Sequence, residues 1–332
     1  MIEPTILDVE EALRRISPFI HRTQLVTCAS INAMVSHVHS GGVYFKCENF
    51  QKTGSFKIRG ATNAVMRACE ETPQLRGFVT HSSGNHGQAL AKAARDAHRR
   101  AVIVVPRNAS KLKIAAMEHY GGEIVYCEPT QTAREAACRQ ILAENSPYFA
   151  LIHPYDDPRI IAGQGTLGIE LLQQSQACPL DAVVVPVGGG GLLSGVATAI
   201  KGLFPSVAVF GAEPLNADDT SRSFMSGKLV ASHRPGLPST IADGLLTLNS
   251  TLTFGIIQKN VDGIIVVTEE QIKRAMAVML ERTKMVVEPS SAVGVAAVLY
   301  AGSAQLSQHK RIAVILCGGN VATESISELC KL

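Results

Sequence analysis

The stretch DAVVVPVGGGG, residues 181–191, decides the fold class of this 332-residue chain. A run of Val residues typical of a buried strand ends in four consecutive glycines, and a helix-like segment follows. Strand-like and helix-like runs alternate in the same way along most of the chain. This alternation predicts an α/β architecture with largely parallel sheets. The other clear strand-like runs are 77–83, 101–106, 123–129, 207–214 and 311–317.

Three of these strands run into glycine-rich turns, each of which we expect to lead into a helix. Besides the tetraglycine loop, these turns are SGNHG at 83–87 and CGGN at 317–320. Ligands of open α/β sheets bind at the carboxyl ends of the strands, and helix N-termini bind anions. Tight turns alone would explain one such junction, but three of them favour a ligand site with several polar handles.

The tetraglycine loop suits a compact phosphate group better than a nucleotide. It contains no Walker A pattern, and Leu193 or Ser194 stands where a dinucleotide fingerprint needs its third glycine. Glu213 follows about 20 residues on, where a ribose-binding acid would stand, so a nicotinamide dehydrogenase remains an alternative. Four successive glycines form a nest of backbone N–H groups that fits a phosphate monoester.

A lysine in QKTGSFKIRG, residues 51–60, points to the cofactor. Lys57 stands between Phe56 and Ile58, whereas Lys52 and Arg59 are interpreted as ordinary surface cations. Apolar surroundings lower the pKa of a lysine and make its neutral amine available. Alone, Lys57 would also be interpreted as a surface residue. Together with a phosphate cradle it indicates pyridoxal phosphate, whose aldehyde forms a Schiff base with a lysine.

Composition excludes several other classes of protein. The chain is 46% hydrophobic and 18% charged with a net charge of +3, which excludes a disordered chain and disfavours nucleic-acid binding. Its eight cysteines form no C-x-x-C pair, which fits a reducing, cytoplasmic compartment. Residues 182–200 carry no charge, but Pro186 and several glycines favour a buried strand, turn and helix over a membrane span.

The motifs SFKIRG at 55–60, SSGNHG at 82–87, GGGG at 188–191 and CGGN at 317–320 together resemble the fold-type-II pyridoxal-phosphate enzymes. Within them the chain is similar to the serine racemase and serine/threonine dehydratase branch, over nearly its whole length. The resemblance implies a tryptophan synthase β-like fold and a homodimer. It also implies a large cofactor domain made of 1–76 and 153–332, and a small mobile domain at 77–152.

The resemblance implies a role for each motif residue. Lys57 would bind the cofactor and act as a base on one face of the substrate Cα, with Ser83 as the acid/base on the other face. The implied cofactor contacts are Phe56, Lys57, Asn85, Gly188, Gly189, Gly190, Gly191, Leu192 and Cys317. The implied substrate contacts are Ser82, Ser83, Asn85, His86 and Arg134.

The implied activity is interconversion of L- and D-serine, with β-elimination of L-serine, L-threonine or D-serine to a 2-oxo acid and ammonia. Cys317 replaces the serine common in serine racemases, and the run 153–158 (HPYDDP) is more like dehydratases and hydroxyaspartate lyases. A dedicated dehydratase or 3-hydroxyaspartate ammonia-lyase therefore remains an alternative. A binding or sensor protein that kept only the cofactor is disfavoured, because Lys57 and Ser83 are both present.

Two regulatory sites are also implied by the resemblance. Glu213, Asp219 and the carbonyl of Ala217 would bind a divalent cation, and oxygen ligands suit Mg²⁺ or Ca²⁺. ATP would bind as an effector at the dimer interface. The positions that match this nucleotide site are Lys52, Thr53, Gln88, Tyr120, Arg282, Lys284 and Asn320.

Overall fold

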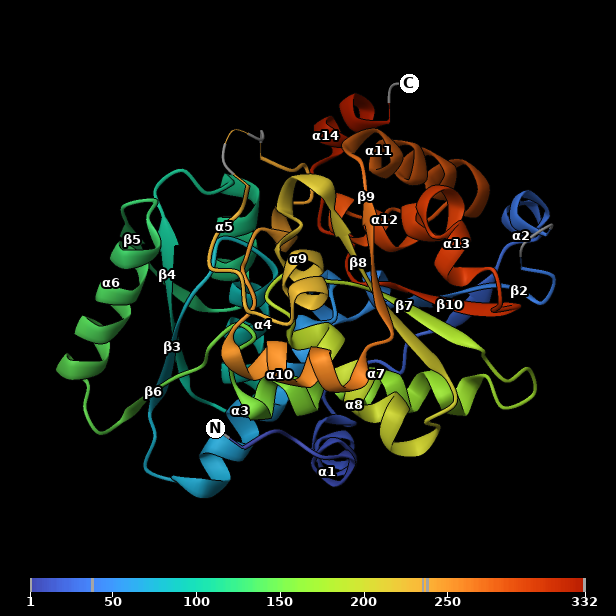
Figure 1. Ribbon diagram of the computed structural model, residues 1–332. Helices are drawn as coiled ribbons and strands as arrows, with labels where there is room; N and C mark the ends of the chain where they lie inside the picture. Colours follow the sequence, from blue (N-terminus) through green and yellow to red (C-terminus); the bar gives the residue numbers. More distant parts are fainter. Residues whose placement is uncertain (1, 37–38, 235, 237–238, 331–332) are drawn as a thin grey trace.

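The computed structural model describes residues 2–36, 39–234, 236 and 239–330, and these form two sheets flanked by helices (Figure 1). The larger sheet has the order β1-β2-β10-β7-β8-β9, and the smaller has the order β5-β4-β3-β6. Every strand pair in these sheets is parallel except β1–β2. The predicted α/β architecture with mostly parallel sheets is confirmed.

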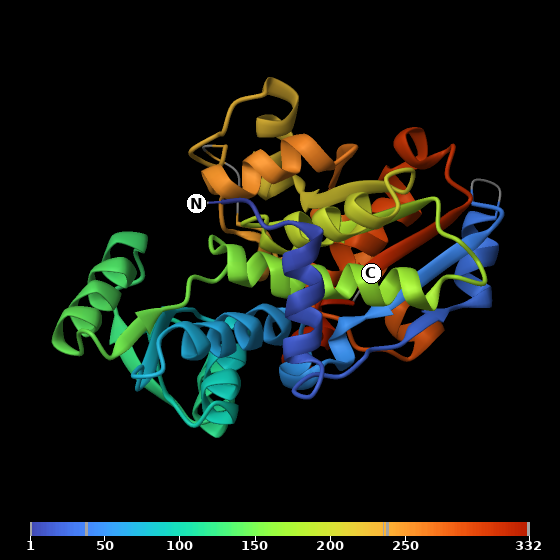
Figure 2. The same cartoon turned by 90° about the horizontal axis from the view of Figure 1, so that it is seen from below.

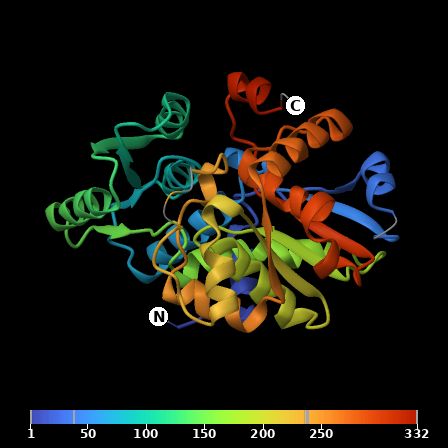
Figure 3. The same ribbon diagram turned by 45° about the horizontal axis from the view of Figure 1, so that its top comes forward.

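The strands of the larger sheet are β1 (Leu25–Thr27), β2 (Gly42–Cys47), β7 (Ala182–Pro186), β8 (Ala208–Pro214), β9 (Gly263–Val267) and β10 (Arg311–Leu316). Those of the smaller sheet are β3 (Gly77–His81), β4 (Arg100–Pro106), β5 (Gly122–Cys127) and β6 (Phe149–Leu151). The smaller sheet is thus built from one continuous stretch of chain. Figures 2 and 3 show this sheet with its helices at one side of the molecule and the larger sheet at the other.

The helices in the first half of the chain are α1 (Ile6–Ile16), α2 (Ala29–Val35), α3 (Lys57–Glu71), α4 (Asn85–Asp96), α5 (Lys111–His119), α6 (Gln131–Glu144) and α7 (Pro158–Gln174). Those in the second half are α8 (Gly191–Leu203), α9 (Asp219–Ser226), α10 (Thr251–Asn260), α11 (Glu269–Val278), α12 (Pro289–Ala296), α13 (Ser303–Leu306) and α14 (Thr323–Leu329). Four short 3₁₀ turns, η1 (Glu48–Phe50), η2 (Lys52–Gly54), η3 (Leu215–Ala217) and η4 (Asp243–Leu245), and two π-helical turns, η5 (Met279–Thr283) and η6 (Ala297–Ala301), complete the described elements.

The central strands of the larger sheet are buried on both faces. Alternate residues of β7 point to opposite sides, so Val183 and Val185 join an apolar cluster with α8 while Val184 joins the cluster that contains α12. Covering both faces in this way explains why the strand reads as an unbroken apolar run. Residues 182–200 form β7, a turn and most of α8, as predicted, and within the described residues no helix has the length and apolarity to cross a bilayer.

One expected helix start is wrong. The chain does not enter a helix directly after the CGGN turn, because α14 begins only at Thr323. Gly318 pairs with Ser55, the Gly319 N–H donates to the Gly54 carbonyl at 2.9 Å, and the Asn320 side chain donates to the Thr53 carbonyl at 2.8 Å. This turn therefore fastens the segment before α3 rather than presenting a helix N-terminus.

Helix α7 lies against α3 on one side and α8 on the other, through contacts that only glycine permits. A Cβ on Gly163 would lie 2.6 Å from the Cα of Gly60, and one on Gly195 would lie 2.6 Å from the Gly165 nitrogen. The three helix backbones therefore touch. Since α3 begins at Lys57 and α8 begins at Gly191, α7 sets the separation between the lysine and the glycine loop.

We predict that Gly163→Ala destabilises the protein by about 1–3 kcal/mol, because the new methyl group would overlap the backbone of α3. Gly255→Ala on α10 is the matched control, since its Cβ would meet only an ordinary contact at 3.4 Å from Glu3 Oε1. The control should gain up to about 1 kcal/mol from helix propensity. Urea unfolding measures both free energies, and equal effects would contradict the close packing of α3 on α7.

Candidate active site

A single cavity at the carboxyl ends of β3, β7 and β10 collects the residues that the sequence assigned to chemistry. All the predicted catalytic, cofactor and substrate residues line it. These are Phe56, Lys57, Ser82, Ser83, Asn85, His86, Arg134, Gly188, Gly189, Gly190, Gly191, Leu192 and Cys317. The structure therefore brings together segments that lie up to 261 positions apart in sequence, from Phe56 to Cys317.

Lys57 is the first residue of α3 and projects into this cavity. Its Nζ donates a hydrogen bond to the Pro154 carbonyl at 2.9 Å and lies 5.2 Å from the centre of the Phe56 ring. Burial lowers the pKa of Lys57 to about 8, although the nearby Cys317 and Glu288 act in the opposite direction. The amine is thus closer to its neutral, nucleophilic form than an exposed lysine at the same pH.

The glycine loop forms a close-fitting cradle before α8. Gly190 has a φ of +90°, and a Cβ on Gly189 would lie 2.6 Å from the Tyr155 ring. Thr247 accepts a hydrogen bond from the Gly189 N–H at 2.9 Å and holds the loop from behind. The first amides of α8 have no acceptor within the helix, so they are available to an anion. These residues fit a phosphate group.

The SSGNHG segment forms the turn into α4 on the opposite side of the cavity. Ser82 accepts hydrogen bonds from the backbone of Gly84 at 3.2 Å and of Gly87 at 3.0 Å, so its hydroxyl shapes the turn. Ser83 is exposed at the cavity wall. His86 is buried, and burial lowers its pKa well below the ordinary histidine value.

A cation and a histidine pair complete this side of the cavity. The Nε of Arg134 is buried and has no hydrogen-bond partner among the described residues. His81 lies edge-on to His153 with ring centres 5.7 Å apart, and burial lowers the pKa of His81 to about 4. Neutral imidazoles therefore leave Arg134 as the charged group on this wall at neutral pH.

Asn85 is held by a carboxylate that the sequence analysis missed. Its Nδ2 donates to both oxygens of Glu288, at 2.9 and 3.1 Å, and its Oδ1 accepts from Asn320 at 2.8 Å. Glu288 is only 4% exposed, and burial raises its pKa to about 7. The sequence did carry a signal, because Glu288 is a single acid between Val287 and Pro289, just as Lys57 is a single cation between apolar neighbours.

Cys317 lies at the floor of the cavity and is 3% exposed. Burial raises the pKa of its thiol, and Glu288 adds to the effect. The thiol is therefore neutral at physiological pH. The Ser291 hydroxyl lies 3.4 Å from its sulfur.

Two further groups at the cavity mouth could not be found from the sequence. Lys113 on α5 forms an ion pair with Asp243 on η4, and both line the cavity. The pair joins the part of the chain that carries the smaller sheet to the part that carries the larger one. Each residue stands among polar neighbours in the sequence and resembles a surface charge, so only the fold reveals the pairing.

The predicted cation ligands lie together at the end of β8. Glu213 is the penultimate residue of this strand, Ala217 ends η3 and Asp219 begins α9. Burial raises the pKa of Glu213 and raises that of Asp219 to about 6, and Asp219 Oδ2 has no hydrogen-bond partner among the described residues. In the described part of the chain no group of three His, Cys, Asp or Glu side chains forms a metal site, so further ligands would be carbonyls and water.

The predicted nucleotide positions lie on neighbouring elements. Lys52 and Thr53 form part of η2, which packs against α4, where Gln88 is buried. Asn320 donates to the Thr53 carbonyl at 2.8 Å. The remaining positions lie at the ends of other elements, with Tyr120 after α5, Arg282 in η5 and Lys284 just after it.

Arg59 does not lie on the surface as the sequence analysis expected. It is fully buried two residues after Lys57 and forms ion pairs with Glu48 and Glu170. That prediction was wrong because both partners are distant in sequence and each looks like an ordinary surface acid there. Lys52 is half-buried.

Comparison with known proteins identifies the family. The model of the pyridoxal-phosphate dependent enzymes matches residues 16–318. The chain belongs to this family. It is 47% identical over 329 residues to a serine racemase of Dictyostelium discoideum, covering 99% of this chain and 98% of the relative.

Two solved structures show how closely the fold is shared. The structure of maize serine racemase superposes with a TM-score of 0.91 at 40% identity, over 98% of this chain and 97% of that one. A threonine deaminase from the organism abbreviated T.th. superposes with a TM-score of 0.87 at 40% identity, over 96% and 99% of the two chains. The chain is therefore a fold-type-II pyridoxal-phosphate enzyme, as the resemblance implied.

The raised pKa of Glu288 predicts a pH dependence of stability. A carboxyl group whose folded pKa lies above its unfolded value stabilises the fold at low pH, and this contribution is lost as pH rises through about 7. From pH 5 to 8 the unfolding free energy of cofactor-free Glu288→Gln should therefore fall less than that of wild type, by about 2–3 kcal/mol. Chemical denaturation across this range measures the difference. Glu324→Gln, at an exposed site on α14, is the control and should follow wild type. Parallel curves for Glu288→Gln and wild type would contradict the assignment.

Proposed function

We propose that this protein is a pyridoxal-phosphate-dependent serine racemase that also eliminates the β-hydroxyl of L-serine, releasing a 2-oxo acid and ammonia. The observation that carries the proposal is the placement of Lys57 and Ser83 in the same cavity as the glycine cradle. Full-length similarity to proteins named serine racemase supports it. L-threonine and D-serine are further substrates of the elimination.

The cavity fits the cofactor on three counts. Backbone amides of residues 188–192 would hold its phosphate, Lys57 would bind its aldehyde, and the neutral Cys317 thiol would face its ring nitrogen. Bound pyridoxal phosphate withdraws electrons from the Cα of an amino acid and so weakens the Cα–H bond. A neutral thiol does not fix a positive charge on the ring as an aspartate would, which favours racemisation and elimination over transamination.

Two groups of this chain move the Cα proton. With its pKa near 8, Lys57 accepts the proton of L-serine on one face, and the Ser83 hydroxyl donates one on the opposite face to give D-serine. A hydroxyl is a weak acid and base, so proximity and orientation supply much of its effect. The amides at the start of α4 and the Arg134 cation would bind the substrate's anionic end.

Two residues favour elimination as a second function. Cys317 replaces the serine common in serine racemases, and Tyr155 of the HPYDDP run packs over the glycine loop. Both features are typical of the dehydratases and hydroxyaspartate lyases, and a threonine deaminase is among the structures that superpose well. A dedicated L-serine/L-threonine dehydratase or 3-hydroxyaspartate ammonia-lyase is the alternative.

Several further properties belong to the proposal. Glu213, Ala217 and Asp219 bind Mg²⁺ or Ca²⁺, and their buried, partly unpaired oxygens support this. ATP acts as an effector at the site that contains Thr53 and Asn320, in a cytoplasmic homodimer. Residues 77–152 move as a small domain that closes over the substrate, with Lys113 and Asp243 meeting in the closed form.

The cofactor assignment predicts an absorbance band near ~410 nm after reconstitution with pyridoxal phosphate, because the bound imine absorbs there. Lys57→Ala should lose this band, while Lys228→Ala, at an exposed position, should keep it. Titration followed by spectrophotometry makes the comparison. No band in wild type would end the cofactor proposal, and a band retained in Lys57→Ala would move the covalent site elsewhere.

The two-face scheme predicts that Ser83→Ala lowers the rate of D-serine formation from L-serine by at least about 100-fold, because no other donor serves that face. Release of pyruvate from L-serine should persist, since Lys57 still removes the proton. Chiral chromatography and a pyruvate assay measure the two outcomes, with Ser307→Ala as an exposed control. Equal loss of both activities would refute the assignment of Ser83.

A further inference from the structure

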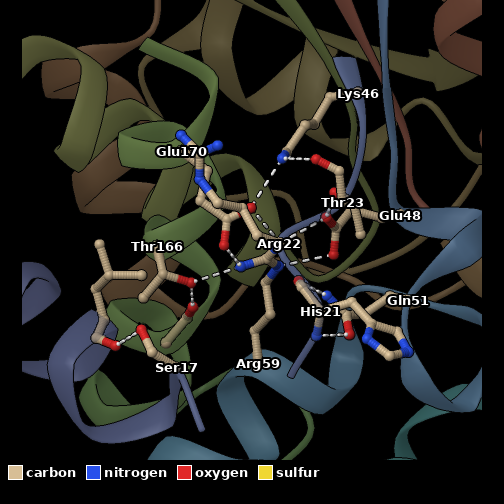
Figure 4. Close-up of polar contacts among 12 residues, drawn as sticks. Ser17, His21, Arg22, Thr23, Lys46, Glu48, Gln51, Arg59, Thr166 and Glu170 are labelled. Carbon is tan, nitrogen blue, oxygen red and sulfur yellow. Dashed lines mark hydrogen bonds and ion pairs between the residues drawn. The ribbon is translucent and has the colours of Figure 1, made fainter. Parts of the chain in front are cut away.

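An ion cluster surrounds Arg59, two residues after the lysine of the cavity (Figure 4). Its charged members are Lys46 on β2, Glu48 on η1, Arg59 on α3 and Glu170 on α7. All four residues are at most 3% exposed, and the two cations balance the two carboxylates. The cluster therefore ties together separate elements around the start of α3.

Every N–H group of the Arg59 side chain is used. Its Nε and Nη2 donate to the two oxygens of Glu48 at 2.7 Å each, and its Nη1 and Nη2 donate to those of Glu170 at 2.8 Å each. The fifth N–H donates to the Thr166 hydroxyl at 3.2 Å. Two carboxylates thus grip one planar guanidinium along two edges, which fixes its position and its orientation.

The acids are themselves fixed from other sides. Lys46 donates to Glu170 at 2.8 Å, to the Thr23 carbonyl at 2.9 Å and to Gln174 at 2.9 Å. Burial alone would raise the pKa of Glu170, but the charges and hydrogen bonds of Arg59 and Lys46 outweigh it and keep the pKa low. The carboxylate therefore stays ionised and keeps its hold on Arg59.

The cluster has no evident role in net stability. Burying four charges has a large desolvation cost that offsets their attraction, and apolar residues of similar volume often serve equally well. What such a network does supply is a unique geometry. Here that geometry is imposed on the first turn of α3.

The start of α3 has no side-chain cap of its own. The N-cap residue Phe56 makes no capping hydrogen bond from its side chain, and the first turn holds two cations and no acid. Cations are unfavourable at a helix N-terminus. Lys57 relieves this by its lowered pKa, whereas Arg59 cannot lose its proton and so requires both carboxylates.

Lys57 and Arg59 project from opposite sides of this turn. Residues two apart on a helix are separated by about 200° around its axis. Lys57 therefore faces the cavity, where its Nζ meets Pro154, while Arg59 faces the cluster behind it. Any rotation or slip of the first turn would move both side chains together.

We infer that Arg59 is a positioning residue for Lys57, and that the four-charge cluster holds the first turn of α3 in the rotation that points the lysine amine into the cavity. This inference rests on the proposed function, because it assigns the cluster a part in delivering Lys57 to the cofactor. The titratable groups that face Lys57 are Cys317, Glu288, His86 and His153, and none of them belongs to the cluster.

The test is Arg59→Lys, which keeps the positive charge but has three donors instead of five and no planar fork. The readout is the rate at which the cofactor-free protein takes up pyridoxal phosphate, followed by absorbance across pH 6–10. We expect the apparent pKa of this uptake to rise by about one unit, because a loosened first turn lets water reach Lys57. Uptake at pH 7 should then fall about tenfold.

The matched control is Leu306→Ala, which opens a fully buried position on α13, remote from the cluster. Thermal melting shows how far each variant is destabilised. A structural role alone would lower the melting temperature in both variants and leave the pKa of uptake at the wild-type value. That result in Arg59→Lys would overturn the inference.

A second variant keeps the test decisive if Arg59→Lys does not fold. Glu170→Gln preserves the shape of the side chain and removes one of the two charges that hold Arg59. It should raise the pKa of uptake in the same direction, and an unchanged pKa would overturn the inference. If wild type itself takes up no pyridoxal phosphate, the proposed function fails, and that outcome is distinct from failure of the inference.

Discussion

The contact of the α7 backbone with α3 and α8 is the constraint on which the site depends. Gly60 meets Gly163, and Gly165 meets Gly195, at distances that exclude any side chain. A cofactor with an aldehyde at one end and a phosphate at another needs both partners at a set separation. α7 provides it, because Lys57 begins one neighbouring helix and Gly191 begins the other.

The groups around the cavity are kept near neutrality by burial, which suits proton transfer at physiological pH. The pKa of Lys57 is lowered to about 8 and that of Glu288 is raised to about 7, while the Cys317 thiol is held neutral. Full charge is confined to Arg134 on the wall and to the ion pair at the mouth. Behind α3 the arrangement is reversed, since Arg59 and its two acids are charged and fully paired.

Local patterns in the sequence were enough to predict the fold class and the cofactor pocket. Apolar runs ending in glycines predicted the strands and the cradle, and an isolated lysine predicted the covalent site. Arg59, Glu288 and the Lys113–Asp243 pair could not be predicted with the same means, because their partners lie 11 to 203 positions away. A charged residue looks the same in the sequence whether water or a distant carboxylate satisfies it. The CGGN turn was misjudged for a related reason, since its glycines serve contacts with the segment 53–55 rather than a helix start.

The central claim is that α7 holds the lysine and the glycine loop in place before the cofactor arrives. Crystal structures of the protein with and without pyridoxal phosphate test it most directly, through the Cα separation of Lys57 and Gly190. The account predicts a change of less than about 0.5 Å, with the phosphate on the amides of residues 188–192. A cavity that assembles only on binding, with α3 and α8 shifted apart or together, would contradict it.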